Sequence, residues 1–164
     1  MSKIEQKLKE NRNRRAREKL LSALDEASRI VLSNSKYDSD ISCLKYAAFP
    51  TWDIESDCQT TTRGIVDGWQ NETFKYWDDL VEKIRNSDIE NNLLGWFFID
   101  TDGPFYLLEW CEMTRILDSI SNYAKSNEHY DFGWVGANSD FGIIAEFEHT
   151  SFCRNEFEVS KWGI

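Results

Sequence analysis

The chain has 164 residues, of which 41% are hydrophobic and 29% charged, and its formal net charge is −10. This length and apolar content fit one globular domain and exclude a chain that is disordered throughout. Apolar runs stay well short of the roughly 18 residues that a membrane helix needs, and the charged N-terminus lacks the apolar stretch of a secretory signal, so we expect a cytoplasmic protein.

The charges are divided unevenly along the sequence. Residues 1–33 hold nine bases and five acids, a net charge of +4, and the remaining 131 residues hold ten bases and 24 acids, a net charge of −14. A body with this charge repels nucleic acid and anionic membranes, and it attracts basic protein surfaces within a Debye length of roughly 8 Å. Negative charge that serves only solubility is the competing interpretation.

The N-terminal segment is predicted to form one helix from Lys3 to about Ser33. It contains no Gly or Pro, and apolar residues recur at helical spacing in its second half. We therefore divide the chain into a basic helical arm at 1–19 and a single α+β domain at 20–164. The arm is expected to project, to fray or to lie on the acidic body, and an arm that binds RNA is the alternative.

Residues 34–72 are polar and rich in turn-forming residues, with short strands possible around 41–48 and 60–66. Acids and aromatic residues alternate there, as in an interface with buried anchors and a polar rim. We predict that this segment binds a partner protein. The predicted partner-binding residues are Asp38, Asp40, Trp52, Asp53, Glu55, Asp57, Asp67, Trp69 and Glu72. In the competing interpretation, the tryptophans belong to the core and the acids form its solvated rim.

A second helix is predicted over 73–86, capped by Asn71 or Thr73, because apolar residues recur there at steps of three and four. A third helix is predicted over 111–125 for the same reason.

Two β-hairpins are predicted in the C-terminal half. The first joins 93–100 to 104–110 through a turn in which Gly103 supplies a positive φ, and the second joins 131–137 to 141–148. The C-terminal tail alternates apolar and polar residues and is expected to add an edge strand. These elements predict an α+β fold in which an antiparallel sheet of hairpins has helices packed on one face, preceded by a long N-terminal helix.

The sequence contains no recognisable catalytic motif. His129 and His149 each follow a glutamate, but acid–base cleavage of RNA by this pair needs a substrate that a body of charge −14 repels. The cysteines form no C-x-x-C pair, and we expect reduced, mostly buried thiols. Gly133 and Gly136 indicate close packing or a bulge in a strand. We therefore predict no catalytic residue, no metal site and no cofactor.

The order of these elements resembles a known family. The segments LLGWFFIDTDGPFYLLEW (93–110) and HYDFGWVGANSDFGIIAEFE (129–148), which flank a helix, resemble the single-domain immunity proteins encoded beside bacterial polymorphic and contact-dependent toxins. The resemblance implies a cytosolic, non-enzymatic protein that binds one cognate toxin tightly.

The charge distribution and the resemblance together predict an acidic inhibitor. We expect it to neutralise a basic toxin, most simply a nuclease, by occluding the active site, and to be a monomer or weak dimer that contacts neither nucleic acid nor membrane directly. The alternative is a nucleic-acid or ribonucleoprotein accessory factor that uses the basic N-terminal helix.

Overall fold

The structure is a computed structural model that describes residues 3–39, 51–53, 58–61, 64–65, 68–100, 103–149 and 155–164. Its helices are α1 (Lys3–Ala23), α2 (Glu26–Asn34), α3 (Trp77–Arg85) and α4 (Trp110–Asn127). Its strands are β1 (Lys36–Asp38), β2 (Thr51–Asp53), β3 (Cys58–Thr61), β4 (Gly64–Ile65), β5 (Gln70–Phe74), β6 (Leu94–Phe98), β7 (Phe105–Glu109), β8 (Phe132–Val135), β9 (Gly142–His149) and β10 (Asn155–Trp162).

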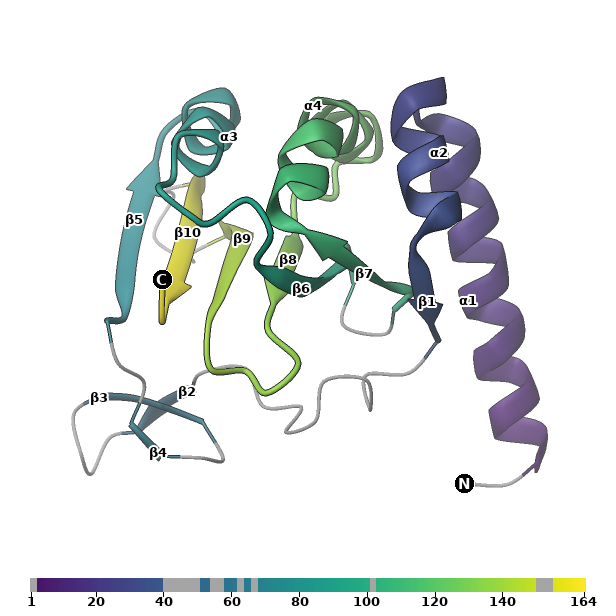
Figure 1. Cartoon of the computed structure of the whole chain (residues 1–164), viewed down its shortest axis with the longest axis horizontal. Helices are drawn as coiled ribbons and strands as arrows, with labels where there is room; N and C mark the ends of the chain where they lie inside the picture. Colours follow the sequence, from purple (N-terminus) through teal and green to yellow (C-terminus); the bar gives the residue numbers. More distant parts are fainter. Residues whose placement is uncertain are drawn as a thin grey trace.

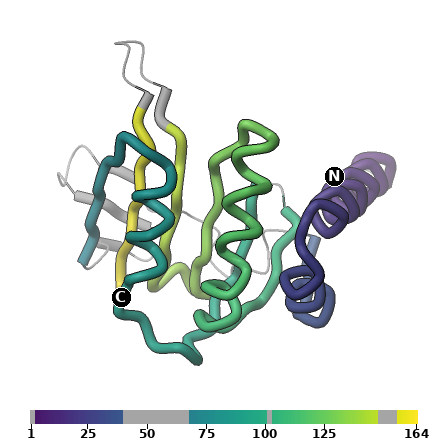
Figure 2. The backbone as a smooth tube through the Cα atoms, turned by 90° about the horizontal axis from the view of Figure 1, so that it is seen from above, coloured from purple at the N-terminus to yellow at the C-terminus, as the bar shows by residue number. Residues whose placement is uncertain are grey.

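Seven strands form one antiparallel sheet in the order β1-β7-β6-β8-β9-β10-β5, and β2, β3 and β4 form a smaller sheet. Figure 1 shows α3 and α4 over one face of the large sheet, with α2 in the same layer and α1 along the flank beside β1. Seen from above, α3 and α4 lie side by side and α1 is outermost (Figure 2). The predicted α+β class, with helices on one face of an antiparallel sheet, is confirmed.

The single helix predicted over 3–33 is wrong, because the chain breaks between α1 and α2 at Leu24 and Asp25. Asp25 is the N-cap of α2, and its carboxylate accepts a hydrogen bond from the Ser28 N–H at 2.8 Å. The Asp25 N–H donates in turn to the Ser119 hydroxyl of α4 at 3.1 Å. An aspartate that caps a new helix therefore turns the chain back onto the helix layer.

The C-terminal end of α1 is closed by a side chain of α2. The Arg29 guanidinium donates to the carbonyl oxygens of Leu21 at 2.9 Å and Leu24 at 3.0 Å. Carbonyls at the end of a helix lack partners inside it, and a basic side chain that binds them stabilises the end. The break is thus specified from both sides.

The second predicted helix is shorter than expected, and its predicted start is a strand. Asn71 and Thr73, the predicted caps, both lie within β5, where Phe74 pairs with Phe157 of β10. The N-cap of α3 is Tyr76, whose side chain makes no capping hydrogen bond. Phe74 fits the helical spacing of α3, but the pairing of β5 with β10 overrides that local pattern.

The two hairpins and the third predicted helix are confirmed. Strands β6 and β7 pair across a turn in which Gly103 has a φ of 87°, and β8 pairs with β9. At the start of α4, the Glu109 N–H donates to Oε2 of Glu112 at 3.0 Å, and the Glu109 side chain accepts from the Glu112 N–H. This reciprocal capping box fixes where the helix begins.

The C-terminal tail is not the edge strand that its sequence predicts. It forms β10, which lies between β9 and β5, so the edge position belongs to β5. The interior position explains why Val159 and Trp162 are buried. None of the described helices combines the length and apolar character that crossing a bilayer requires.

Both faces of the seven-stranded sheet carry apolar clusters. The helix face, which α3 and α4 cover, packs a cluster that includes Trp77, Leu80, Phe97, Tyr106, Met113, Ile116, Phe132 and Trp134. The second face, which points away from the helices, carries the buried residues Trp96, Phe98, Phe105, Val135 and Trp162. Side chains of a strand alternate between faces, so Phe97 joins one cluster while Trp96 and Phe98 join the other.

Candidate protein-binding surface

The described members of the predicted binding set are separated by the sheet order. Asp38 lies in β1 and Glu72 in β5, and these strands are the two edges of the seven-stranded sheet. Six spacings between neighbouring strands put the edges roughly 29 Å apart. The structure therefore does not bring Asp38 and Glu72 together.

Glu72 also faces the helix layer. It lies opposite Val159, whose side chain belongs to the helix-face cluster, and its carboxylate binds Lys83 of α3 at 2.8 Å. The carboxylate is thus half-exposed beside α3, and it points away from the second face.

Trp69 precedes β5 and lies on the second face. Its ring stacks on Trp162 with 5.5 Å between centroids and 23° between planes. Trp162 is fully buried and donates from Nε1 to the carbonyl of Ser139 at 3.0 Å. Trp69 itself is only half-buried. One side of its ring is therefore part of the packing, and the remaining exposed part is apolar surface at the margin of the second face.

The other predicted binding residues are placed incompletely. Trp52 and Asp53 belong to β2 and pair with positions 59 and 58 of β3, and their side chains lie outside what the structure describes. The remaining members lie outside the described residues: Asp40, Glu55, Asp57 and Asp67. Binding through this part of the segment stays a prediction.

The structure brings together a set of acids that the sequence analysis missed. In the hairpin of β9 and β10, Glu146 lies directly opposite Glu158, and Glu148 lies directly opposite Glu156. We call these four residues the glutamate ladder. Opposed residues of an antiparallel pair have Cβ atoms roughly 4.5–5.5 Å apart, and like charges at this distance destabilise the pair. The register of the hairpin therefore places acidic positions directly opposite one another.

Aromatic packing on the helix face fixes this register. Phe147 and Phe157 are opposite one another between the glutamates, with ring centroids 5.3 Å apart. Phe157 also packs on Tyr130 at 5.1 Å and on Trp77 of α3 at 5.5 Å. A slip by one residue would exchange phenylalanines for glutamates in this packing, so the aromatic contacts disfavour it.

Period-two alternation places Glu146, Glu156 and Glu158 on the second face, together with Ile144 and Trp162. The Glu148 side chain lies outside what the structure describes. Glu146 is exposed, and Glu156 and Glu158 are half-exposed. The side-chain amide of Asn71 in β5 donates a hydrogen bond to Glu158. The second face thus has an acidic end at the ladder and an apolar end where Ile144, Trp162 and Trp69 meet.

A local signal for the ladder does exist in the sequence. The same triplet, Glu-Phe-Glu, occurs at 146–148 and at 156–158. Each triplet alone predicts a strand with one aromatic and one acidic side. Only the pairing of the two strands makes the acids face one another.

The described part of the chain does not bring His129 and His149, the candidate catalytic residues, together with other catalytic groups. Nε2 of His129 lies 3.1 Å from the carbonyl oxygen of Ile99, so this half-buried ring is held by the backbone. The His149 side chain lies outside what the structure describes. Among the described residues, no three His, Cys, Asp or Glu side chains converge as a metal-binding group.

Comparison of the chain with protein-family models, curated proteins and solved structures finds no match.

Proposed function

We propose that this chain is a non-enzymatic acidic inhibitor that binds a basic protein through the glutamate ladder. The observation that carries the proposal is the direct opposition of Glu146 to Glu158 and of Glu148 to Glu156. The basic partner is most simply a nuclease toxin in the cytoplasm, and the chain acts as its immunity protein by covering the active site.

The close spacing of the ladder carboxylates offers a cationic partner a concentrated negative surface. Like charges held opposite one another in an antiparallel pair are unfavourable by roughly 0.2–1 kcal/mol for each pair, and a cationic surface laid on them offsets that cost. A nuclease holds phosphate groups with Lys and Arg side chains, which are suited to bind closely spaced carboxylates as well. The aromatic packing of Phe147 and Phe157 beneath the ladder keeps the carboxylates in position before the partner arrives.

The apolar end of the second face supports the same use. Half-buried Ile144 is two positions from Glu146 on the same face, and half-buried Trp69 lies farther along it; apolar anchors with a charged rim are the usual composition of a protein interface. The charge of −14 outside residues 1–33 adds long-range attraction, which raises association rates toward about 10⁸–10⁹ M⁻¹s⁻¹ at low salt.

The test is binding to the protein encoded by the neighbouring gene. Co-expression is expected to rescue cells from that protein, and stopped-flow association is expected to slow steeply between 50 and 500 mM NaCl as a general electrostatic effect. The variant Glu156→Gln/Glu158→Gln keeps the side-chain size and removes two ladder charges. We expect it to raise Kd by about tenfold or more.

A matched control carries the same change in net charge on another part of the surface. Asp88→Asn/Glu90→Gln alters two exposed acids between α3 and β6. We expect this control to slow association slightly and to leave dissociation unchanged. If the two variants weaken binding equally, the ladder acts only through the net charge of the protein. An association rate that does not depend on salt would contradict the electrostatic basis of the proposal.

The predicted loop residues provide a second location for the interface. If charge reversal at Asp53, Glu55 and Asp57 weakens binding while the ladder variant does not, the interface lies on the segment between β1 and β5. If both variants weaken binding, the partner covers both regions.

A further inference from the structure

The inner side of α1 is fixed by a short series of contacts. Asn13 is buried, and its Nδ2 donates to the carbonyl oxygen of Ser39 at 2.5 Å. One turn later, the Arg17 guanidinium lies 5.0 Å from the centre of the Tyr37 ring in β1. Leu20 is buried farther along the same stripe. The 3.6-residue period then assigns the opposite side of α1 to solvent.

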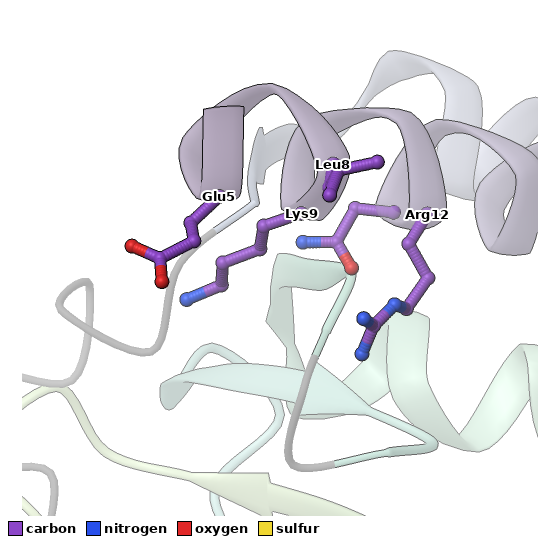
Figure 3. A pocket seen from close by; sticks show the side chains of 5 residues that line it. Glu5, Leu8, Lys9 and Arg12 are labelled. Atoms are coloured by element: carbon purple, nitrogen blue, oxygen red, sulfur yellow. The ribbon is translucent and has the colours of Figure 1, made fainter. Parts of the chain in front are cut away.

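Between the inner and outer sides, α1 borders a hollow of about 290 Å³ lined by Glu5, Leu8, Lys9, Arg12 and Asn13. Figure 3 shows Glu5, Lys9 and Arg12 pointing from α1 toward the body of the protein, whereas Leu8 does not point with them. The charged side chains nearest the body therefore turn inward, and Leu8 belongs to the outer side.

The outer side of α1 has an apolar end and a cationic end. Ile4 and Leu8 are 73% and 60% exposed, and they occupy one stripe with Arg15. Arg14 and Arg15 are both exposed at the cationic end, where Oε1 of exposed Glu18 lies 4.0 Å from Nε of Arg14 and partly offsets its charge. With a rise of 1.5 Å per residue, Arg15 lies roughly 13 Å along the helix from the midpoint between Ile4 and Leu8.

The second face has the same spacing with the opposite charge. Along β10, the ladder is centred on position 157, and the apolar end, where half-buried Ile144 and Trp69 flank buried Trp162, is centred near position 161. At about 3.3 Å per residue, these centres are also roughly 13 Å apart. Apolar groups would thus meet apolar groups, and arginines would meet glutamates, if the outer side of α1 lay along this strip.

The two surfaces cannot meet within one molecule. The strand that α1 flanks is separated from β9 and β10 by four and five strand spacings, or roughly 19–24 Å. This distance exceeds two Debye lengths of roughly 8 Å at physiological salt, so the acidic ladder does not cancel the cations of α1.

We infer that the outer side of α1 is a docking surface for the glutamate ladder and the adjoining apolar strip of a second copy of this chain. The contact joins two different surfaces, so it extends head to tail. It occupies the ladder, and a basic partner of the ladder therefore competes with self-association. The inference rests on the charge and spacing of the two surfaces and is independent of the proposed inhibitor function.

A nucleic acid is a less complete match for the same helix. It would use the arginines, but phosphate groups make no use of exposed Ile4 and Leu8, and the net charge of −14 outside residues 1–33 opposes it. Nucleic-acid binding is therefore an outcome of the test.

The experiment uses the full chain in sedimentation equilibrium from 10 to 500 µM at 50 and 500 mM NaCl. The weight-average mass is expected to rise with concentration at 50 mM NaCl and to return to the monomer value at 500 mM. Two charge-reversed variants are examined in parallel: Arg14→Glu/Arg15→Glu on α1 and Glu156→Lys/Glu158→Lys on β10. Circular dichroism and thermal unfolding establish that each is folded.

Mixing the two variants tests whether self-association needs surfaces of opposite charge. Each alone presents two surfaces of the same sign and is expected to stay monomeric. Mixed in equal amounts, they supply complementary surfaces again, and self-association is expected to return. The matched control Asp88→Lys/Glu90→Lys, which changes the net charge as much as the ladder variant, is expected to associate like the native chain.

Three results would overturn the inference: a native chain that stays monomeric at 500 µM and 50 mM NaCl, a mixture that stays monomeric, or loss of association in the control. A fluorescein-labelled 20-nucleotide RNA is titrated in the same buffer. Binding that disappears in the α1 variant while the mixture stays monomeric would assign the helix to nucleic acid instead. None of these results bears on toxin binding, which is measured separately.

Discussion

The two faces of the seven-stranded sheet differ most at the hairpin of β9 and β10. On the helix face, Phe147 and Phe157 pack against each other and on aromatic side chains of the helix layer. On the second face, the neighbours of these phenylalanines include Glu146, Glu156 and Glu158, and Glu146 lies directly opposite Glu158. The same period-two alternation therefore produces a stabilising side and a repulsive side. Packing on one face holds the charges of the other in a geometry that they would not adopt alone.

Among substitutions on the two faces, those of tryptophans are expected to differ most in the unfolding free energy that they cost. Trp77 on α3 is 4% exposed and donates from Nε1 to the Ser121 hydroxyl at 2.8 Å, so Trp77→Ala is expected to cost about 3–5 kcal/mol of unfolding free energy. Trp69→Ala removes a half-buried ring from the margin of the second face and is expected to cost about 1 kcal/mol. Urea denaturation measures both. Equal losses would show that Trp69 belongs to the core.

The centre of the second face is expected to be as intolerant of added volume as a core. A Cβ atom on Gly133 would lie 2.4 Å from Cζ of Phe98, so the ring would have to move. Gly133→Ala is expected to cost about 1–3 kcal/mol in urea denaturation. Combining it with Phe98→Leu, which frees space, should recover part of that loss. A stable Gly133→Ala protein would mean that this face is loosely packed.

The break between α1 and α2 gives a pH-dependent prediction. Hydrogen bonds from the Ser28 N–H and then from the Ser119 and Ser28 side chains lower the pKa of Asp25 below its ordinary value of 3.8. A lowered pKa stabilises the folded state above pH 3.8, and the stabilisation is lost as the pH falls through the folded pKa. Asp25→Ala is therefore expected to be less stable than the native chain at pH 7, with a difference that shrinks at pH 2.5.

The matched variant Asp25→Asn keeps a side-chain oxygen that can accept the Ser28 hydrogen bond. We expect it to retain more stability than Asp25→Ala at pH 7 and to lack the pH-dependent contribution of the carboxylate. Thermal unfolding at the two pH values separates these cases. A stability difference between the native chain and Asp25→Ala that does not depend on pH would contradict the role of the charge.

The smallest change in unfolding free energy is expected for a substitution at Tyr106, which lies on the helix face beside α1. Burial raises the pKa of its phenol, which stays neutral, although nearby Arg17 opposes the shift. Among the described residues, the Tyr106 hydroxyl has no hydrogen-bond partner. Tyr106→Phe is therefore expected to change the unfolding free energy by less than about 0.5 kcal/mol. A loss above about 1.5 kcal/mol would reveal a hydrogen bond to the Arg17 guanidinium.

The sequence predicts the locally encoded parts of this fold. The hairpins follow from short alternating runs around turns such as the one at Gly103, and α4 follows from helical spacing. Strand β5 does not, because its polar sequence is organised by pairing with β10, and Phe74 meets Phe157 across 83 residues of chain. Segments whose conformation depends on a distant partner carry little signal of their own.

The candidate binding surface shows the same limit. The predicted set runs from Asp38 to Glu72 along the sequence, yet the strand order places these two residues at opposite edges of the sheet. The ladder, by contrast, is assembled by a register that neither Glu-Phe-Glu triplet specifies alone. Proximity in sequence grouped Asp38 with Glu72, which the strand order separates, whereas pairing of distant segments brought the ladder positions together.

The unfolding free energy of Glu156→Gln/Glu158→Gln, compared with Asp88→Asn/Glu90→Gln, tests most directly whether the ladder is a repulsive surface. Gln at 158 can still accept the hydrogen bond from Asn71, so the ladder variant removes charge with little change in packing. We predict that it is more stable than the native chain by roughly 0.2–1 kcal/mol for each opposed pair, with little change in the control. A ladder variant that is no more stable than the native chain would contradict the account.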